Sequence, residues 1–185
     1  AGTDEFTIYN LQADTSIRVV IRPNSTNYTV AYSIVGKNGE DTSAGTLTAK
    51  TGNRIISTGE SCTAYASLTF TYEESEDYEF VGWEVTGTKG TEASDGTTHT
   101  YTISSLNAGT IVMAEVQKKP KVTVDSSIEN GSVSVTYQWN GETVTPTANG
   151  YVYTGTVATV TATPADGYVV DTIKANGTTI LTGDK

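Results

Sequence analysis

The sequence is poor in cysteine and histidine, with one residue of each among its 185. One thiol cannot form a disulfide within the chain, and a structural zinc ion needs four Cys or His ligands. Cys62 and His99 could form a nucleophile–base pair only if the fold brings them together. We expect instead that Cys62 is a small core residue and that His99 is exposed on a strand, so we predict no enzyme, no metal and no cofactor.

Positive charge and long apolar runs are also scarce. Lys and Arg number 11 against 21 Asp and Glu, which gives a formal charge of −10. Such a field repels a phosphate backbone, and the three lysines around Pro120 are better explained as an exposed linker. No stretch approaches the roughly 20 apolar residues of a membrane span. We therefore expect neither nucleic-acid binding nor membrane insertion.

Runs of strong helix-forming residues are missing, while Thr, Ser, Val, Gly and Tyr are abundant. Apolar and polar residues alternate with a period of two around Ile17 and Val19, around Val133 and Val135, and around Val160. Asn-Gly and Asp-Gly steps such as Asn140-Gly141 tolerate positive φ and favour hairpins. The sequence therefore predicts an all-β fold of tandem small β-rich modules, either β-sandwich or β-grasp-like, with little or no helix.

Internal repetition is the most informative feature of the sequence. Residues 7–17 (TIYNLQADTSI) resemble residues 102–111 (TISSLNAGTI). A second correspondence joins the stretch that begins at residues 68–71 (LTFT) to the one that begins at residues 160–163 (VTAT). Matching positions are about 90–95 residues apart, which is the size of one module.

The phase of the repeats predicts three segments. Residues 1–22 carry the tail strands of a preceding or partner module, 23–118 form a complete module, and 119–185 begin another module whose tail motif does not appear. Proline and like charges disfavour a continuing ladder, so the expected junction lies at the Lys-Lys-Pro sequence before residue 121.

Several short motifs, in a fixed order, resemble those of a known family. The motifs are residues 32–35 (YSIV) with Gly39, 45–49 (GTLTA), 68–71 (LTFT), 78–83 (YEFVGW), 101–106 (YTISSL) and 161–168 (TATPADGY). With these motifs the chain is similar to the divergent internalin B-repeat, also called the Listeria–Bacteroides repeat, of bacterial surface proteins. Thr172, where the family typically has Gly-Trp, and the acidic stretch 73–77 (EESED) depart from the pattern. The resemblance implies an extracellular, cell-surface stalk or adhesive spacer, and it implies no catalytic residues.

Aromatic and acidic residues offer the other candidate contacts. Trp139 at a predicted hairpin tip, with Tyr151 and Tyr153 on one strand face, is the best candidate patch for a carbohydrate such as a host or cell-wall glycan. Trp83 is expected to anchor the core. The acidic stretch 73–77 lacks the ligand order of an EF-hand and is expected to be a solvated loop.

The sequence thus predicts a non-catalytic structural or adhesive module, with a carbohydrate-binding module as the alternative. Its expected partners are copies of itself or adjacent repeat modules. Residues 7–21 of one copy could complete the sheet that begins at Lys121 of another, as in donor-strand addition. The alternative is that neighbouring modules of a longer array supply these strands in cis. The candidate inter-subunit strand contains Thr7, Ile8, Leu11, Ile17, Val19 and Ile21.

Overall fold

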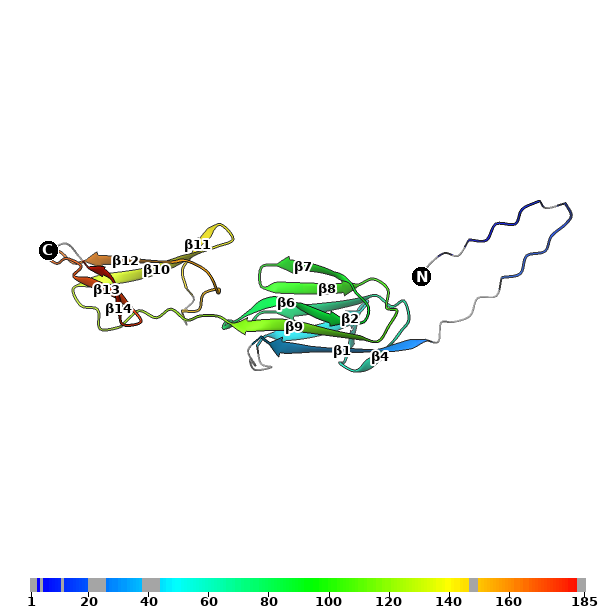
Figure 1. Ribbon diagram of the computed structural model, residues 1–185, viewed down its shortest axis with the longest axis horizontal. Helices are drawn as coiled ribbons and strands as arrows, with labels where there is room; N and C mark the ends of the chain where they lie inside the picture. The colour runs from blue at the N-terminus through cyan, green and yellow to red at the C-terminus, as the bar shows by residue number, and fades with distance from the viewer. Residues whose placement is uncertain are drawn as a thin grey trace. The chain divides into compact units, whose positions relative to one another are not determined.

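The computed structural model describes residues 3, 5–10, 12–19, 26–37, 44–146 and 150–182. These residues form strands and turns, with no helix among them and hence no helix that could span a membrane. The all-β prediction is confirmed. The chain divides into two compact units, residues 1–117 (unit 1) and 118–185 (unit 2), which are described separately below (Figure 1).

Unit 1 contains two β-sheets that enclose one core. The first sheet has the order β4 (Glu60–Thr63), β1 (Asn27–Gly36), β9 (Thr110–Lys118) and β6 (Tyr78–Thr86). The second has the order β3 (Arg54–Ile56), β2 (Thr46–Thr51), β5 (Leu68–Glu73), β8 (Thr98–Ile103) and β7 (Thr91–Asp95). The arrangement is a β-sandwich, and its described residues contain no helix of the kind that a β-grasp fold requires.

The local sequence explains these strands. In β8 and β9 every second side chain is buried, which matches the period of two in a pleated strand. Gly52, with φ of 56°, turns the chain between β2 and β3, and Gly96, with φ of 61°, does so between β7 and β8. Both turns are tight because glycine adopts left-handed backbone angles without steric cost.

The core of unit 1 consists of apolar side chains from both sheets. Its largest cluster joins side chains of β1 and β9 in the first sheet to those of β2, β5 and β8 in the second. Val30, Leu68, Phe70, Ile103 and Val112 have no exposed surface. A contiguous cluster of this kind is what makes a module of this size stable by itself.

The last two strands of unit 1 close the sandwich. β8 pairs antiparallel with β5, with Leu68 opposite Ile103 and Phe70 opposite Tyr101. β9 lies parallel to β1, with Val30 opposite Thr110. Each of β5 and β1 therefore has a hydrogen-bonded neighbour on both sides.

The sequence of β6 predicts that Phe80 and Trp83 are buried, with a turn or bulge near Gly82, because Tyr78, Phe80 and Trp83 cannot all share one strand face. Both rings pack against the core, but they are only partly buried. Tyr78 and Phe80 contact the core from even positions, and Trp83 and Val85 from odd ones. The inward face therefore changes between Phe80 and Trp83.

Unit 2 has a smaller ordered sheet. β10 (Gly131–Trp139) lies between β11 (Glu142–Val144) and β12 (Ala158–Pro164), and β13 (Thr172–Ala175) forms a hairpin with β14 (Thr178–Thr182). The turns are Asn140-Gly141, as predicted, and Asn176-Gly177, and all four residues have positive φ. An isolated antiparallel bridge joins Lys121 to Tyr151.

The first strands of unit 2 repeat those of unit 1. β10 pairs with β11 and β12 as β2 pairs with β3 and β5. The bridge between Lys121 and Tyr151 matches the antiparallel pairing of β1 with β4. Among the described residues of unit 2, nothing corresponds to β8 beside β12 or to β9 beside residues 121–124.

Residues 5–10 and 12–19, here called the N-terminal segment, contain no assigned strand and appear in Figure 1 as a blue trace without arrows. The alternation at Ile17 and Val19 predicts a strand, but a strand requires a hydrogen-bonded neighbour, and none pairs with these described residues. Leu11 and Ile21, which the sequence analysis placed in the same strand pair, lie outside the described residues.

Candidate functional site

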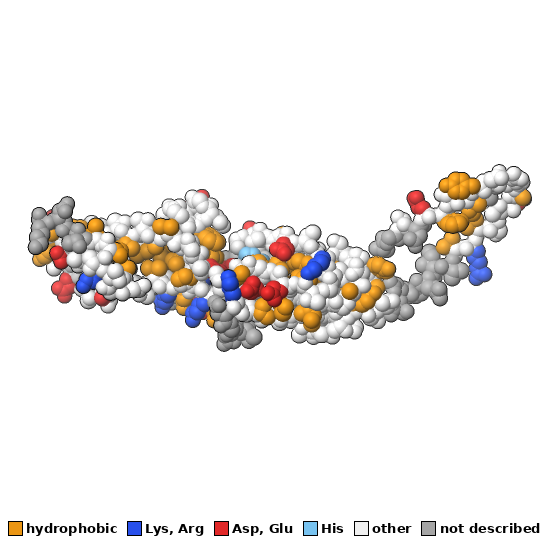
Figure 2. Space-filling view, in the orientation of Figure 1, with side chains coloured by type: hydrophobic (Ala, Val, Ile, Leu, Met, Phe, Trp, Pro, Cys, Tyr) orange, Lys and Arg blue, Asp and Glu red, His pale blue; other side chains and the backbone are white. Residues whose placement is uncertain are grey.

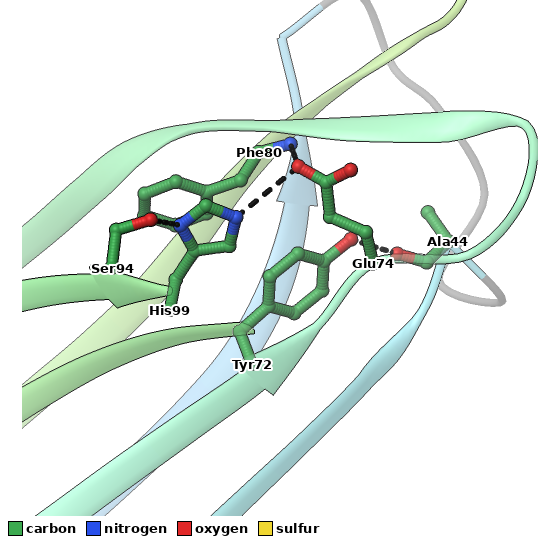
Figure 3. A network of polar contacts seen from close by, with 6 residues as sticks. All are labelled: Ala44, Tyr72, Glu74, Phe80, Ser94 and His99. Atoms are coloured by element: carbon green, nitrogen blue, oxygen red, sulfur yellow. Dashed lines mark hydrogen bonds and ion pairs between the residues drawn. The ribbon is translucent and has the colours of Figure 1, made fainter. Parts of the chain in front are cut away.

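A polar cluster in unit 1 surrounds His99 of β8 (Figure 3). His99 Nδ1 is 2.9 Å from Ser94 Oγ of β7, and Nε2 is 3.2 Å from Oε1 of Glu74, which follows β5. The Phe80 backbone N–H donates to the same carboxylate oxygen at 2.9 Å. A carboxylate only accepts, so His99 Nε2 carries a proton, and in the neutral ring Nδ1 accepts from the Ser94 hydroxyl.

Aromatic rings enclose this cluster. The Phe80 ring stacks on His99 with 4.1 Å between centroids, and Tyr72 lies 6.2 Å away in a second stacked arrangement. Burial raises the pKa of Tyr72, with Glu74 as a smaller cause, and its hydroxyl donates to the Ala44 carbonyl. The cluster contains the serine, histidine and carboxylate of a hydrolytic relay, but its contacts attach the acidic turn after β5 to strands β6, β7 and β8.

Two sequence predictions about this region are wrong. His99 is 8% exposed rather than a surface residue, because the alternation in β8 turns it to the same face as Tyr101 and Ile103. Glu74 does not lie in a solvated loop, since its side chain is 3% exposed and paired with His99. The signal that could have revealed both is the run Thr98–Ile103, in which His99 occupies an inward position of an otherwise regular strand.

Cys62 is a core residue, as expected, with 3% of its surface exposed. Its thiol packs in the main apolar cluster of unit 1, whereas His99 contacts Ser94, Glu74 and aromatic rings. Burial raises the pKa of the Cys62 thiol, with the nearby Glu60 carboxylate as the second cause. The thiolate needed for nucleophilic attack is therefore disfavoured.

No cluster of three or more His, Cys, Asp or Glu side chains that could hold a metal ion occurs within the described ranges.

The aromatic patch proposed from the sequence is partly assembled in unit 2. Trp139, at the end of β10, and Tyr153 stack face to face at 3.7 Å with 5° between their planes. Lys119 Nζ lies 4.5 Å from the centroid of the Tyr153 ring. Tyr151 is not part of this stack, and its ring centroid lies 5.6 Å from Lys121 Nζ. A ring stacked at 3.7 Å leaves no room on that face of Tyr153, so Lys119 occupies the other face. Of this stacked pair, the outer face of the half-buried Trp139 is the one left for a sugar.

The sequence predicts that Lys119 belongs to an exposed linker, and this prediction is wrong. Only 8% of its surface is exposed, because its side chain lies along the aromatic stack. Its ammonium group lies over the Tyr153 ring, a favourable position for a cation.

Apolar side chains are exposed along the N-terminal segment. Phe6 is 90% exposed, Val19 76%, Ile17 69% and Ile8 41%. Thr7 is exposed as well. Figure 2 shows orange apolar side chains on the surface of this segment, and an exposed apolar group is a candidate for an interaction surface.

Unit 2 also leaves apolar residues exposed, next to an open cavity. Val157 is 77% exposed, Val124 45% and Val160 40%. The cavity has a volume of about 580 Å³ and lies between residues 121–124 and β10, with Val122, Val124, Val133 and Val135 in its lining. In unit 1 the corresponding space between β1 and β2 is filled core.

Comparison with protein-family models, with curated proteins and with solved structures found no match to this chain.

Proposed function

We propose that this protein is a non-catalytic building block of an extracellular bacterial surface structure, and that its copies associate head to tail by strand complementation. One observation carries the proposal. Core-type side chains are exposed in the N-terminal segment, and unit 2 has an open core with an unpaired sheet edge. The N-terminal segment has apolar side chains without a core, and unit 2 has a core and a sheet edge without the strands to cover them.

The open edge is the feature that a solitary protein avoids. β12 has β10 on one side and, among the described residues, no strand on the other. Unpaired backbone groups on an edge strand are a template for strand addition from another chain. An acceptor on unit 2 and a donor at the other end of the sequence make a heterologous contact, which propagates rather than closes.

The energetics favour a reversible, concentration-dependent contact. Burial of a Phe, Ile or Val side chain contributes roughly 1.5–3 kcal/mol, so the four exposed side chains of the segment supply about 6–12 kcal/mol. Association costs about 4–15 kcal/mol in lost freedom. Side-chain burial alone is thus nearly balanced by that cost, and the backbone ladder along β12 supplies the remaining stabilisation.

The cell-surface location and the adhesive or spacer role rest on the resemblance of the repeat motifs to internalin-type repeats. Threonine-rich β-modules without cysteine suit a long stalk whose function is spacing and display. Polymerisation of such modules provides length without any new fold.

Sedimentation velocity across a range of protein concentrations tests the assembly. We expect the weight-average mass to rise with concentration for the wild-type chain and to remain monomeric for Ile17→Glu. Ser16→Glu is the matched control, because it adds the same charge one position away, on the opposite strand face. A monomeric wild-type chain, or equal loss of assembly in both variants, would contradict the proposal.

A further inference from the structure

We propose a specific docking site on unit 2 for the N-terminal segment of a second copy. Residues 5–8 run antiparallel along the free edge of β12, and residues 15–19 run parallel to residues 121–124. This inference rests on the proposed head-to-tail assembly and adds the register, the direction of each strand and the side chains that fill the cavity.

Unit 1 provides the template for the register. Residues 7–17 match the end of β8, the connecting loop and the start of β9, and these two strands are the ones without a counterpart in unit 2. In unit 1 they add to β5 and β1, respectively. The N-terminal segment therefore has the sequence of the two strands for which unit 2 has open positions.

Transfer of the antiparallel pairing fixes the first register. In unit 1, Leu68 faces Ile103 and Phe70 faces Tyr101. Val160 and Ala162 occupy the matching positions of β12, and Ile8 and Phe6 match the two residues of β8. Ile8 is thereby placed opposite Val160, and Phe6 opposite Ala162.

The parallel pairing fixes the second register. In unit 1, Val30 lies opposite Thr110 and Tyr32 opposite Val112. The bridge between Lys121 and Tyr151 corresponds to the pairing of β1 with β4. The 92-residue spacing between Leu68 and Val160 then aligns Val122 with Val30 and Val124 with Tyr32. Thr15 then lies opposite Val122, and Ile17 opposite Val124.

The inward face of the segment agrees with this placement. In β9 the buried positions are Thr110, Val112, Ala114 and Val116, and the positions between them are more exposed. The matching inward residues of the segment are Thr15, Ile17 and Val19, while Ser16 and Arg18 face outward. A shift by one residue would bury the Arg18 charge and expose both apolar side chains, so the alternation selects one register.

The cavity of unit 2 lies where Ile17, the central residue of the inward face of the segment, would be placed. Val30, Ala49 and Val112 belong to one buried cluster in unit 1. Val122 matches Val30 and Val133 matches Ala49, and both line the cavity of unit 2. The match of Val112 is Ile17, which is therefore the side chain that enters the cavity.

Side-chain sizes are complementary along β12. Unit 1 sets Phe70 opposite Tyr101, two large rings in one core. Unit 2 has the small Ala162 where unit 1 has Phe70, and the segment brings Phe6 to the position of Tyr101. A small residue beneath a large ring leaves the space that the ring fills.

Two residues of the candidate strand, Leu11 and Ile21, lie outside the described residues, and only their sequence matches are given. Leu11 matches Leu106, which is fully buried in unit 1 and exchanges backbone hydrogen bonds with residues 65 and 66. Ile21 matches Val116, which is also fully buried. Both are apolar, as the inward face requires.

Cross-linking between two variants that each carry one introduced cysteine tests the register. Thr7→Cys and Thr161→Cys are exposed substitutions at positions that face each other in the proposed ladder, as Thr69 and Thr102 do in unit 1. The two variants are mixed and oxidised, so a bridge between positions 7 and 161 can form only between chains. The native Cys62 is buried and remains in place, and the wild-type chain measures its background.

Thr163→Cys serves as a comparison, because it would form the disulfide if the register were shifted by two residues. We expect the mixed disulfide to form on the order of tenfold faster with Thr161→Cys, because a disulfide tolerates little extra separation between its two cysteines. Two results would overturn the register but not the head-to-tail assembly. The first is a chain that assembles in sedimentation but forms no disulfide with Thr161→Cys. The second is a disulfide that forms faster with Thr163→Cys. A wild-type chain that remains monomeric would overturn both the register and the head-to-tail assembly. The open edge of β12 would then need a partner other than a second copy.

Discussion

Unit 1 and unit 2 begin with the same strand order and differ in whether the sandwich is closed. In unit 1, β8 and β9 supply Tyr101, Ile103 and Val112 to a core whose central side chains are fully buried. In unit 2 the matching sheet stops at β12, and Val160, at the position of Leu68, is 40% exposed. The comparison shows how much of a module's core depends on its last two strands.

The same comparison explains the N-terminal segment. Phe6, Ile8 and Ile17 have the residue types of buried strand positions but are exposed in the single chain. Their exposure costs solubility without a benefit unless another surface covers them. In the proposed assembly, the open edge of β12 in a second copy is the surface that covers them.

Truncation at matching core positions should show the largest difference between the units. Leu68→Ala removes a side chain with no exposed surface, and we expect a loss of roughly 2–5 kcal/mol in the unfolding free energy of unit 1. Val160→Ala, measured on dilute monomeric chain, should cost unit 2 about 1 kcal/mol or less. Chemical denaturation of each variant measures both values, and equal losses would mean that the core of unit 2 is already closed in the monomer.

The polar cluster provides a second test, since unit 2 contains no histidine. Glu74→Ala leaves His99 and the Phe80 N–H without their carboxylate, so we expect a loss of about 1–3 kcal/mol in unit 1 and none in unit 2. Glu92→Ala, on the exposed strand β7, is the matched control and should have little effect. If Glu74→Ala were as mild as the control, the cluster would have no role in stabilising the turn after β5.

Much of the fold could be predicted from the sequence, because strand alternation and Asn-Gly turns are local signals. Alternation in β9 and β10 and the turn at Asn140-Gly141 are all present in the structure. The repeat also predicts strands within residues 7–17, but the described residues of that stretch contain no assigned strand. These signals act within a few residues, so no knowledge of tertiary contacts is needed to detect them.

The features that sequence patterns missed depend on long-range contacts. His99 and Glu74 were expected to be exposed, but they meet because β5 and β8 are neighbours in the second sheet. Lys119 was assigned to a linker, but it lies against a ring 34 positions further along the sequence, that of Tyr153. Charged residues are usually exposed, and only the tertiary structure identifies the few that have a buried partner.

Amide hydrogen exchange along β5 and β12 tests the central claim most directly, because it compares the closed edge with the open edge in one molecule. We predict that residues 68–73 are protected at every protein concentration, since β8 covers that edge. Residues 158–163 should exchange quickly in dilute wild-type chain and become protected as assembly proceeds, while in Ile17→Glu they should stay unprotected at all concentrations. Protection of β12 in the dilute monomer, or its absence in fully assembled protein, would contradict strand complementation at this edge.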